Sequence, residues 1–339
     1  MSDEKKYDLI GLGSCTMDSI YEVKDVMRME MIDRDNTDKK YIAIEHSSKL
    51  NVSAVEFHPG GSAANIACDL ARIGFKTAYI GGIGNDGNGK SCMEDMEQRG
   101  VDLSGIKIFE HDLTANSVIL ITPWGRDRSI LAYKGANNLF GPEHVDESML
   151  KSTRCFVWTS LTSEKGIEAI SKCIDLAKST GALIAGAPSI SIIKNSADAA
   201  RNLLKRCDIT SLNDEEIEAL TGESDVLKAM NTLFDWGLKE VNVTFGKEGQ
   251  WISDGKDLIK TKPPKVFPRD TTGAGDATMA GIIYGTLRNK SLHERARIAA
   301  SLSAMEIEEE GVRVGTPKTW DELQHFMDIH EIKQETLSL

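Results

Sequence analysis

The sequence predicts an α/β protein in which a doubly wound, mostly parallel sheet is flanked by helices. Short apolar runs of strand length alternate with runs that keep helical spacing, so the strands follow one another through helices. Strands joined in this way form crossover connections, which produce a parallel sheet. A polar stretch at residues 27–57 alternates weakly and shows no helical period. We expect it to form a small β-rich lid outside the main sheet.

The expected elements begin with a strand at residues 7–12 and an extended segment at 19–23. Further strands are expected at 77–83, 117–122, 129–133, 155–159, 182–187, 208–211 and 240–245, and helices at 63–73, 89–99, 166–179, 197–206, 214–220, 226–236 and 277–287. The strands at 117–122 and 129–133 flank the turn 123–125, as in an antiparallel pair. No repeat or low-complexity linker divides the chain. We therefore expect a single domain over 1–339, with 20–59 and 114–137 contributing the lid.

The composition restricts the class of partner. Forty basic and 52 acidic residues give a net charge of -12, which disfavours nucleic acid. Six cysteines lack any CxxC spacing, a pattern typical of reduced thiols rather than zinc ligands or disulfides. No apolar run reaches the length of a membrane span. Together these features predict a soluble cytoplasmic protein.

The most informative stretch is Asp270-Thr271-Thr272-Gly273-Ala274-Gly275-Asp276-Ala277, which opens the last expected helix. Glycines at a helix start let the backbone approach a ligand, and the free N–H groups there bind an anion. A carboxylate just past that site would repel the anion. Asp276 is better placed to accept a proton from a hydroxyl that attacks a phosphorus held on the amides. A simple turn capping a buried helix is the alternative, and the two threonines and the carboxylate favour phosphoryl chemistry.

Three other groups of residues are candidates for ligand binding. Asp18 ends the first strand region, and the next helix begins with Gly60, Gly61 and Asn65, a set that suits a polyhydroxylated ligand. Asn213 and Glu216 share a face at a helix start. They form either a capping box or a station that binds magnesium through water. The loop that follows the strand at 240–245 could host a nucleotide phosphate through Thr244, Gly246, Lys247 and Gly249.

Residues 84–91 match the Walker pattern G-x-x-x-x-G-K-[ST], with Gly84, Gly89, Lys90 and Ser91 at its fixed positions. The match lies between an apolar strand and a helix, the context that a P-loop NTPase requires. However, no apolar strand ends in an aspartate that could hold the metal. A Gly/Asn/Asp-rich turn that caps the helix is the favoured interpretation, and a P-loop stays the alternative.

With these motifs, the chain resembles the ribokinase-like (pfkB) family of carbohydrate kinases over nearly its whole length. The two signature regions stand here as GGSAANIACDLARIGFKTAYIGGIGNDGNG and DTTGAGDATMAG. The family carries a G-x-D-x-x-G turn at the place of the Walker match, so Lys90 and Ser91 there are coincidental. The resemblance implies a ribokinase-like fold and ATP-dependent phosphorylation of a hydroxymethyl group.

The resemblance also implies roles for individual residues. Asp276 would be the catalytic base, and the amides of Gly273, Ala274, Gly275 and Asp276 the anion hole. The sugar-contacting positions would be Asp18, Gly60, Gly61 and Asn65, with Asn137 after the hairpin. Glu216, in the N-x-x-E motif that Asn213 opens, would hold Mg²⁺ through water. Thr244, Gly246, Lys247 and Gly249 would contact the nucleotide. In potassium-dependent members, residues like Asp270 and Thr272 bind K⁺ with carbonyls of a later loop, here about 311–315.

Departures from the ribokinase pattern leave the substrate open. No acid follows the strand at 155–159, where ribokinases carry a ribose-binding glutamate. The lid segment is also longer than in typical ribokinases, which favours a larger substrate such as a nucleoside. Arg126, Arg128 and Lys134 would suit a phosphorylated sugar, although exposed hairpin charges are usually solvated. A sugar- or nucleotide-binding relative without catalysis is the non-enzymatic alternative. An exposed lid edge would favour a homodimer.

Overall fold

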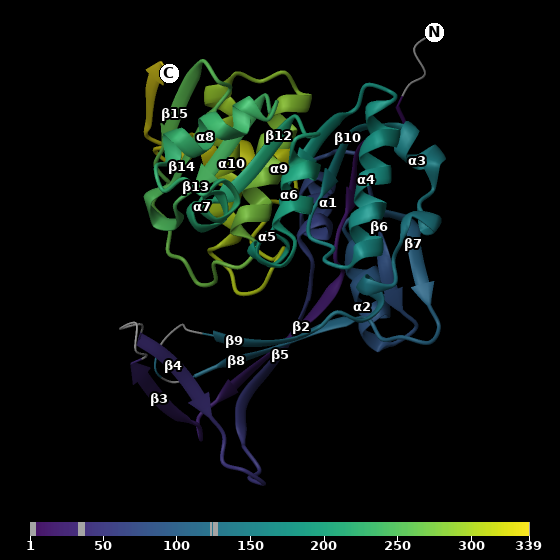
Figure 1. Ribbon diagram of the computed structural model, residues 1–339. Helices are drawn as coiled ribbons and strands as arrows, with labels where there is room; N and C mark the ends of the chain where they lie inside the picture. The colour runs from purple at the N-terminus through teal and green to yellow at the C-terminus, as the bar shows by residue number, and fades with distance from the viewer. Residues whose placement is uncertain (1–4, 33–37, 123, 125–127, 339) are drawn as a thin grey trace.

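A mixed sheet of ten strands forms the centre of the protein (Figure 1). The computed structural model describes residues 5–32, 38–122, 124 and 128–338. The strand order is β16 (Gln334–Ser338), β15 (Asp257–Thr261), β14 (Gln250–Ser253), β13 (Glu240–Thr244), β12 (Ile209–Asn213), β11 (Leu183–Gly186), β10 (Thr153–Trp158), β1 (Tyr7–Leu12), β6 (Thr77–Gly84) and β7 (Asp102–Phe109). The strands from β13 to β7 are parallel, and β14 to β16 add an antiparallel edge.

Helices cover both faces of this sheet, because alternate residues of its buried strands point to opposite sides. Leu9 of β1 packs with one set of helices and Ile10 with the other. The first set is α1 (Ser62–Arg72), α2 (Gly87–Gln98), α9 (Ala274–Leu287), α10 (Leu292–Glu306) and α11 (Trp320–Ile329). The second is α3 (Glu147–Lys151), α4 (Glu164–Lys178), α5 (Ile190–Asn195), α6 (Ala197–Leu204), α7 (Asp214–Thr221) and α8 (Val226–Asp235). The predicted doubly wound fold is confirmed.

The chain reverses its direction of travel across the sheet at β1. From β1 it passes to β6 and β7 on one side, and later from β10 to β13 on the other. Ligands of open α/β sheets bind beyond the carboxyl ends of the strands at such a switch point. A ligand site is therefore expected beyond the carboxyl end of β1.

A small separate sheet forms the lid, which lies below the body in Figure 1. Its order is β5 (Val52–Gly60), β2 (Thr16–Val23), β8 (Ala115–Ile121) and β9 (Arg128–Tyr133), and β8 and β9 pair antiparallel as predicted. A hairpin of β3 (Met27–Ile32) and β4 (Asp38–Ala43) extends it at the far end. Residues 123 and 125–127, which include most of the predicted turn and Arg126, lie outside the described residues.

The helices and strands of the sheet match the predicted ranges closely, but several elements were not predicted. β7 and the antiparallel strands β14 to β16 were missed, as were α3, α5, α10 and α11. β7 lies at an edge of the sheet, and its residues are half-buried or exposed, whereas those of the neighbouring β6 are all buried. All six cysteines are buried free thiols. Within the described residues no helix is long and apolar enough to cross a bilayer.

Candidate active site

The start of α9 is a glycine-dependent turn held by Asp270. Oδ1 of Asp270 accepts hydrogen bonds from the Thr272 N–H at 2.9 Å and from the Thr272 hydroxyl at 2.7 Å. Gly273, the N-cap of α9, has a left-handed φ of 83°. A Cβ there would lie 2.7 Å from Oε1 of Glu306, so the position needs glycine. The first N–H groups of α9 have no acceptor within the helix, which gives the predicted anion site its physical basis.

Asp276 lies in the first turn of α9 and is half-buried. Nδ2 of Asn65, from α1, donates to Oδ2 of Asp276 at 2.6 Å, and Ser62 of the same helix also hydrogen-bonds this carboxylate. Burial raises the pKa of Asp276, while the bonds from Asn65 and Ser62 and the charge of Arg313 act against that rise. The carboxylate is thus held by neutral donors at a pKa above that of an ordinary aspartate, which suits a general base.

The sugar-side residues meet at the junction of the lid and α1. Oδ2 of Asp18 lies 2.9 Å from the place where a Gly60 Cβ would stand, so glycine allows this close approach. Gly61 is the N-cap of α1 with a φ of 114°, and a side chain there would meet the Ser14 carbonyl. Because Asn65 stands in the first turn of the same helix, α1 connects Gly60 and Gly61 directly to Asp276.

The lid also contacts the loop that follows α10, through a residue that sequence reasoning missed. His58 is the register partner of Asp18 on β5, so both side chains lie on one face of the lid. A Cβ on Gly311 would stand 2.6 Å from the His58 ring. The Gly311 N–H in turn donates to Oδ2 of Asp270 at 3.3 Å. The loop predicted to hold a monovalent cation therefore does lie against Asp270.

Two further residues of this region were also missed. Arg313 is 1% exposed, and its Nε donates to Oδ1 of Asn65 at 2.7 Å. Glu306, at the end of α10, accepts the Arg313 N–H at 2.5 Å. Burial raises the pKa of Glu306 to about 7. In the sequence, both are simply charged residues near a glycine-containing loop, and no spacing links them to Asp276.

Asn213 and Glu216 form the capping box that was the simpler of the two interpretations. Asn213 Oδ1 accepts the Glu216 N–H at 2.8 Å, and Glu216 Oε2 accepts the Asn213 N–H at 3.0 Å. Oε1 of Glu216 accepts the Ile190 N–H at 3.2 Å. Burial raises the pKa of Glu216, and the charge of Asp276 raises it further. A role in magnesium binding stays a prediction.

The proposed nucleotide loop lies beside this capping box. Asn213 and Thr244 are register partners at the ends of β12 and β13. Gly246 and Gly249 both have positive φ, and the Phe245 N–H closes the turn on the Gly249 carbonyl at 2.8 Å. Lys247 lies exposed on the turn. The geometry is that of a tight glycine turn next to Glu216, and contact with a nucleotide stays a prediction.

Asn137 holds the backbone between β1 and β2. Its Oδ1 accepts the Cys15 N–H at 3.1 Å and its Nδ2 donates to the Cys15 carbonyl at 3.2 Å. Both polar ends of the amide are thus engaged by main chain, which gives Asn137 a structural role close to Asp18. The predicted contact with substrate remains a prediction.

The Walker-like match does not have the arrangement of a P-loop. The Asp86 carboxylate caps α2, accepting the Gly89 N–H at 2.8 Å and the Thr114 N–H at 2.9 Å. A phosphate would have to compete with this carboxylate for the helix N-terminus. Lys90 points to solvent, with its side chain 79% exposed and 3.9 Å from Glu94. The favoured interpretation, a turn that caps the helix, agrees with these contacts.

Comparison with known proteins decides the family. The sequence profile described as pfkB family carbohydrate kinase matches residues 28–319. The chain belongs to the pfkB family of carbohydrate kinases. Members of this family are phosphotransferases with an alcohol acceptor, so this protein is a kinase of the ribokinase-like fold.

Relatives of known name act on different acceptors. The chain is 29% identical to an uncharacterised sugar kinase of Archaeoglobus fulgidus (74% of this chain, 99% of that protein). It is also 29% identical to the ribokinase of Haemophilus influenzae (78% and 86%). A nucleoside kinase of Methanothermobacter thermautotrophicus is 27% identical (79% and 84%).

Solved structures show the same fold. A protein described as ribokinase II of Escherichia coli, in complex with ATP and Mg²⁺, superposes with a TM-score of 0.80 at 22% identity (96% of this chain, 100% of that chain). An adenosine kinase of Sinorhizobium meliloti superposes with a TM-score of 0.78 at 25% identity (94% and 99%).

Proposed function

We propose that this pfkB kinase transfers the γ-phosphoryl group of ATP to a primary hydroxyl of a small, ribose-like carbohydrate. The observation that carries the proposal is the hydrogen bond between Asn65 and Asp276. Asn65 lies on α1, which directly follows Gly60 and Gly61 beside Asp18, and Asp276 lies in the first turn of α9. The hydrogen bond therefore connects the proposed sugar side of the site to the proposed base. A polyol held on Asp18 would thus present a hydroxyl near a base and an anion site at once.

The chain's own residues supply base and anion stabilisation. Asp276 accepts the proton of the attacking hydroxyl, and the bonds from Asn65 and Ser62 orient its carboxylate. The amides of Gly273, Ala274, Gly275 and Asp276 face the transferring phosphoryl group and stabilise its charge. The lid covers the acceptor side and limits access of water.

The residues present suit magnesium held through water. Both oxygens of Glu216 already accept backbone N–H groups, so direct ligation would cost those bonds. Mg²⁺ keeps most of its hydration shell in proteins, and Glu216 would hold it through that shell. When bound, the ion neutralises phosphate charge. Among the described residues no group of three or more His, Cys, Asp or Glu side chains gathers as a direct metal site.

A nucleoside kinase is the second candidate function. The observation that favours it is the length of the lid, in which β3 and β4 add a separate two-stranded sheet at the far end. A phosphosugar acceptor is supported only by the cationic residues of the β8–β9 hairpin. Of these, Lys134 is exposed, and nothing in the described contacts directs it toward Asp18.

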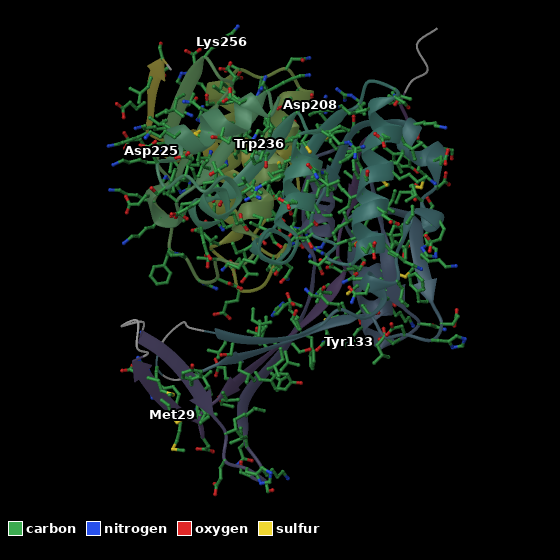
Figure 2. The ribbon with its side chains drawn as sticks, in the orientation of Figure 1. Met29, Tyr133, Asp208, Asp225, Trp236 and Lys256 are labelled. Atoms are coloured by element: carbon green, nitrogen blue, oxygen red, sulfur yellow. The ribbon has the colours of Figure 1, made fainter. Side chains whose placement is uncertain are left out.

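The lid also supports the proposed homodimer. Phe57 of β5 and Leu131 of β9 share the face of the lid opposite to Asp18, and each is 59% exposed. In Figure 2 the labelled side chain of Met29 also lies on the lid, away from the body that carries Asp208 and Trp236. An exposed apolar sheet face is stabilised by pairing with a second copy. Potassium dependence through Asp270 and Thr272, and a cytoplasmic location, are part of the same proposal.

A coupled ADP-release screen tests the function. Pentoses, hexoses, their monophosphates and nucleosides are offered with ATP and Mg²⁺, with and without K⁺. We expect turnover with a ribose-like sugar, and Asp276→Asn should lower kcat by about two to four decades. Lys90→Ala, which removes an exposed side chain, should keep normal turnover.

Two outcomes would contradict the proposal. Near-normal turnover of Asp276→Asn with loss of activity in Lys90→Ala would support a P-loop NTPase. Measurable binding of sugar or nucleotide without ADP release from any acceptor would support a relative that has lost catalysis.

A further inference from the structure

A buried arginine is connected to the proposed base through a single amide. The Nε of Arg313 donates to Oδ1 of Asn65 at 2.7 Å, and Nδ2 of Asn65 donates to Oδ2 of Asp276 at 2.6 Å. The three residues come from the loop after α10, from α1 and from α9. This chain of two hydrogen bonds lies outside any role that the signature motifs imply.

Arginine determines which end of the Asn65 amide faces Asp276. A guanidinium has only donors, so the amide atom that it contacts must be the oxygen. The NH₂ group is then the atom that faces Asp276, and it can only donate. Oδ2 of Asp276 is therefore kept as an acceptor, in the unprotonated form that a general base needs. With the amide turned around, two oxygens would face each other, and the carboxylate would be disfavoured.

The backbone of Arg313 is held in a rare conformation that directs its side chain inward. Its φ is 68°, in the left-handed region that non-glycine residues seldom adopt. The Arg313 N–H donates to Glu306 at 2.5 Å, and the Arg313 carbonyl accepts from Nη1 of Arg99 at 2.7 Å. Such a conformation is unfavourable and persists only where the surroundings enforce it. The hydrogen bonds of the Arg313 backbone therefore hold its guanidinium beside Asn65.

A purely structural ion pair would explain only part of this arrangement. Nη1 of Arg313 donates to Oδ2 of Asp95 at 2.5 Å, which ties the loop to α2. Asp95 is already paired with Arg99 through its other oxygen at 3.0 Å. The tie to α2 therefore accounts for one nitrogen of Arg313. It does not explain the hydrogen bond from Nε of Arg313 to Asn65, the residue that donates to Asp276.

We propose that Arg313 is a positioning residue for phosphoryl transfer, which orients Asn65 so that its amide holds the Asp276 carboxylate ready to accept the substrate proton. The inference rests on the proposed role of Asp276 as base. Arg313 itself touches neither substrate nor phosphate in this role. It acts through Asn65, and its positive charge favours the ionised carboxylate.

Several charged or titratable groups lie around Arg313 and Asp276 and interact electrostatically with them. Around Arg313 they are Cys92 and Asp95 of α2, Arg99 just after it, Cys68 and Asp69 of α1, Tyr79 of β6, Glu306 of α10, and Cys15. Around Asp276 they are Arg313, Glu306, Asp69 and Glu216. The Arg313 charge lowers the pKa of Asp276, and the charge of Asp276 in turn raises the pKa of Glu306, Asp69 and Glu216. Removal of Arg313 should therefore raise the pKa of Asp276.

The pH dependence of kcat/KM in the full-length enzyme tests this inference. Arg313→Gly suits the left-handed backbone and leaves a space of guanidinium shape. We expect kcat to fall about a hundred-fold, as for a small displacement of a catalytic group. We also expect the acid limb of kcat/KM to move to higher pH. Millimolar guanidinium should restore part of the activity, and urea at the same concentration should not.

Arg72→Gln is the matched control. Nη1 of Arg72 donates to the Thr316 carbonyl of the same loop at 3.0 Å, and no hydrogen bond joins Arg72 to Asn65 or Arg313 among the described contacts. We expect it to lower stability without moving the acid limb and without a response to guanidinium. An acid limb in Arg313→Gly that coincides with that of the wild type would overturn the inference. So would an equal shift in Arg72→Gln.

A second variant covers the case in which Arg313→Gly fails to fold. Asn65→Asp keeps an acceptor for Arg313 but removes the donor to Asp276, so the acid limb should again move to higher pH. An acid limb of kcat/KM at the same pH as in the wild type would count against the proposed role of the Arg313–Asn65–Asp276 hydrogen bonds. Failure of the proposed function is distinguishable, because the wild type would then form no ADP with any acceptor.

Discussion

Glu306 carries a carboxyl group whose ionisation opposes folding above neutral pH. Its side chain is buried at the end of α10, and its Oε2 has no hydrogen-bond partner in the described structure. Burial raises the pKa of Glu306 from 4.5 to about 7, and the charge of Asp276 contributes to the rise. Between these two values the folded protein holds the proton more tightly than the unfolded chain. The contribution of Glu306 to stability is therefore full below pH 4.5 and is lost as the pH rises toward 7.

Replacement of Glu306 by glutamine should remove this cost. Glutamine resembles the protonated acid and keeps an oxygen for the Arg313 N–H. Each pKa unit is worth about 1.4 kcal/mol, so the rise amounts to about 3 kcal/mol at full ionisation. We expect Glu306→Gln to raise the free energy of unfolding by up to about 3 kcal/mol at pH 8. The gain should shrink toward zero as the pH approaches 5.

Urea denaturation of both proteins at pH 5 and pH 8 measures the effect. Glu310→Gln is the control, since Glu310 is exposed in the same segment. It should change the free energy of unfolding by no more than about 0.5 kcal/mol at either pH. The reasoning would be refuted if Glu306→Gln were no more stable than the wild type at pH 8, or if its gain were the same at both pH values.

Three other substitutions test separate parts of the structure. Asp86→Ala should lower the free energy of unfolding by about 1–2 kcal/mol in urea titrations, because the carboxylate caps α2; an unchanged value would contradict this role. Gly273→Ala should cost about 1–3 kcal/mol through strain at its left-handed φ. It should also lower kcat in the ADP-release assay, so wild-type turnover would argue against the anion site. Leu131→Lys should convert a dimer to a monomer in gel filtration with light scattering, whereas a monomeric wild type at micromolar concentration would rule out lid pairing.

The sheet and the start of α9 could be predicted because their signals are local. Apolar runs of strand length alternate with helical periods over most of the chain, and these patterns need no information about distant residues. The stretch from Asp270 to Asp276 likewise contains its own turn, anion site and carboxylate. The structure places the turn and the carboxylate where the local pattern indicated, and the anion site stays a prediction. The edge strands β14 to β16 were missed because their positions depend on pairing with one another.

The residues behind the base could not be predicted, because their contacts join distant parts of the chain. Arg313 meets Asn65 across 248 positions, and Asn65 meets Asp276 across 211. Neither the spacing nor the residue type of Arg313 separates it from other arginines near glycine-containing loops. Glu306 is similar, because its raised pKa follows from burial beside Asp276, and burial of a single glutamate has no sequence signature.

The loop 310–315 connects the lid to the proposed base. On one side the His58 ring lies against Gly311, and His58 is the register partner of Asp18 on the lid. On the other side, two residues further along, Arg313 reaches Asn65. A sugar bound at Asp18 would therefore contact the same strand pair that supports this loop. The lid at His58 and the residues behind Asp276 thus contact one short segment, which the signature motifs do not include.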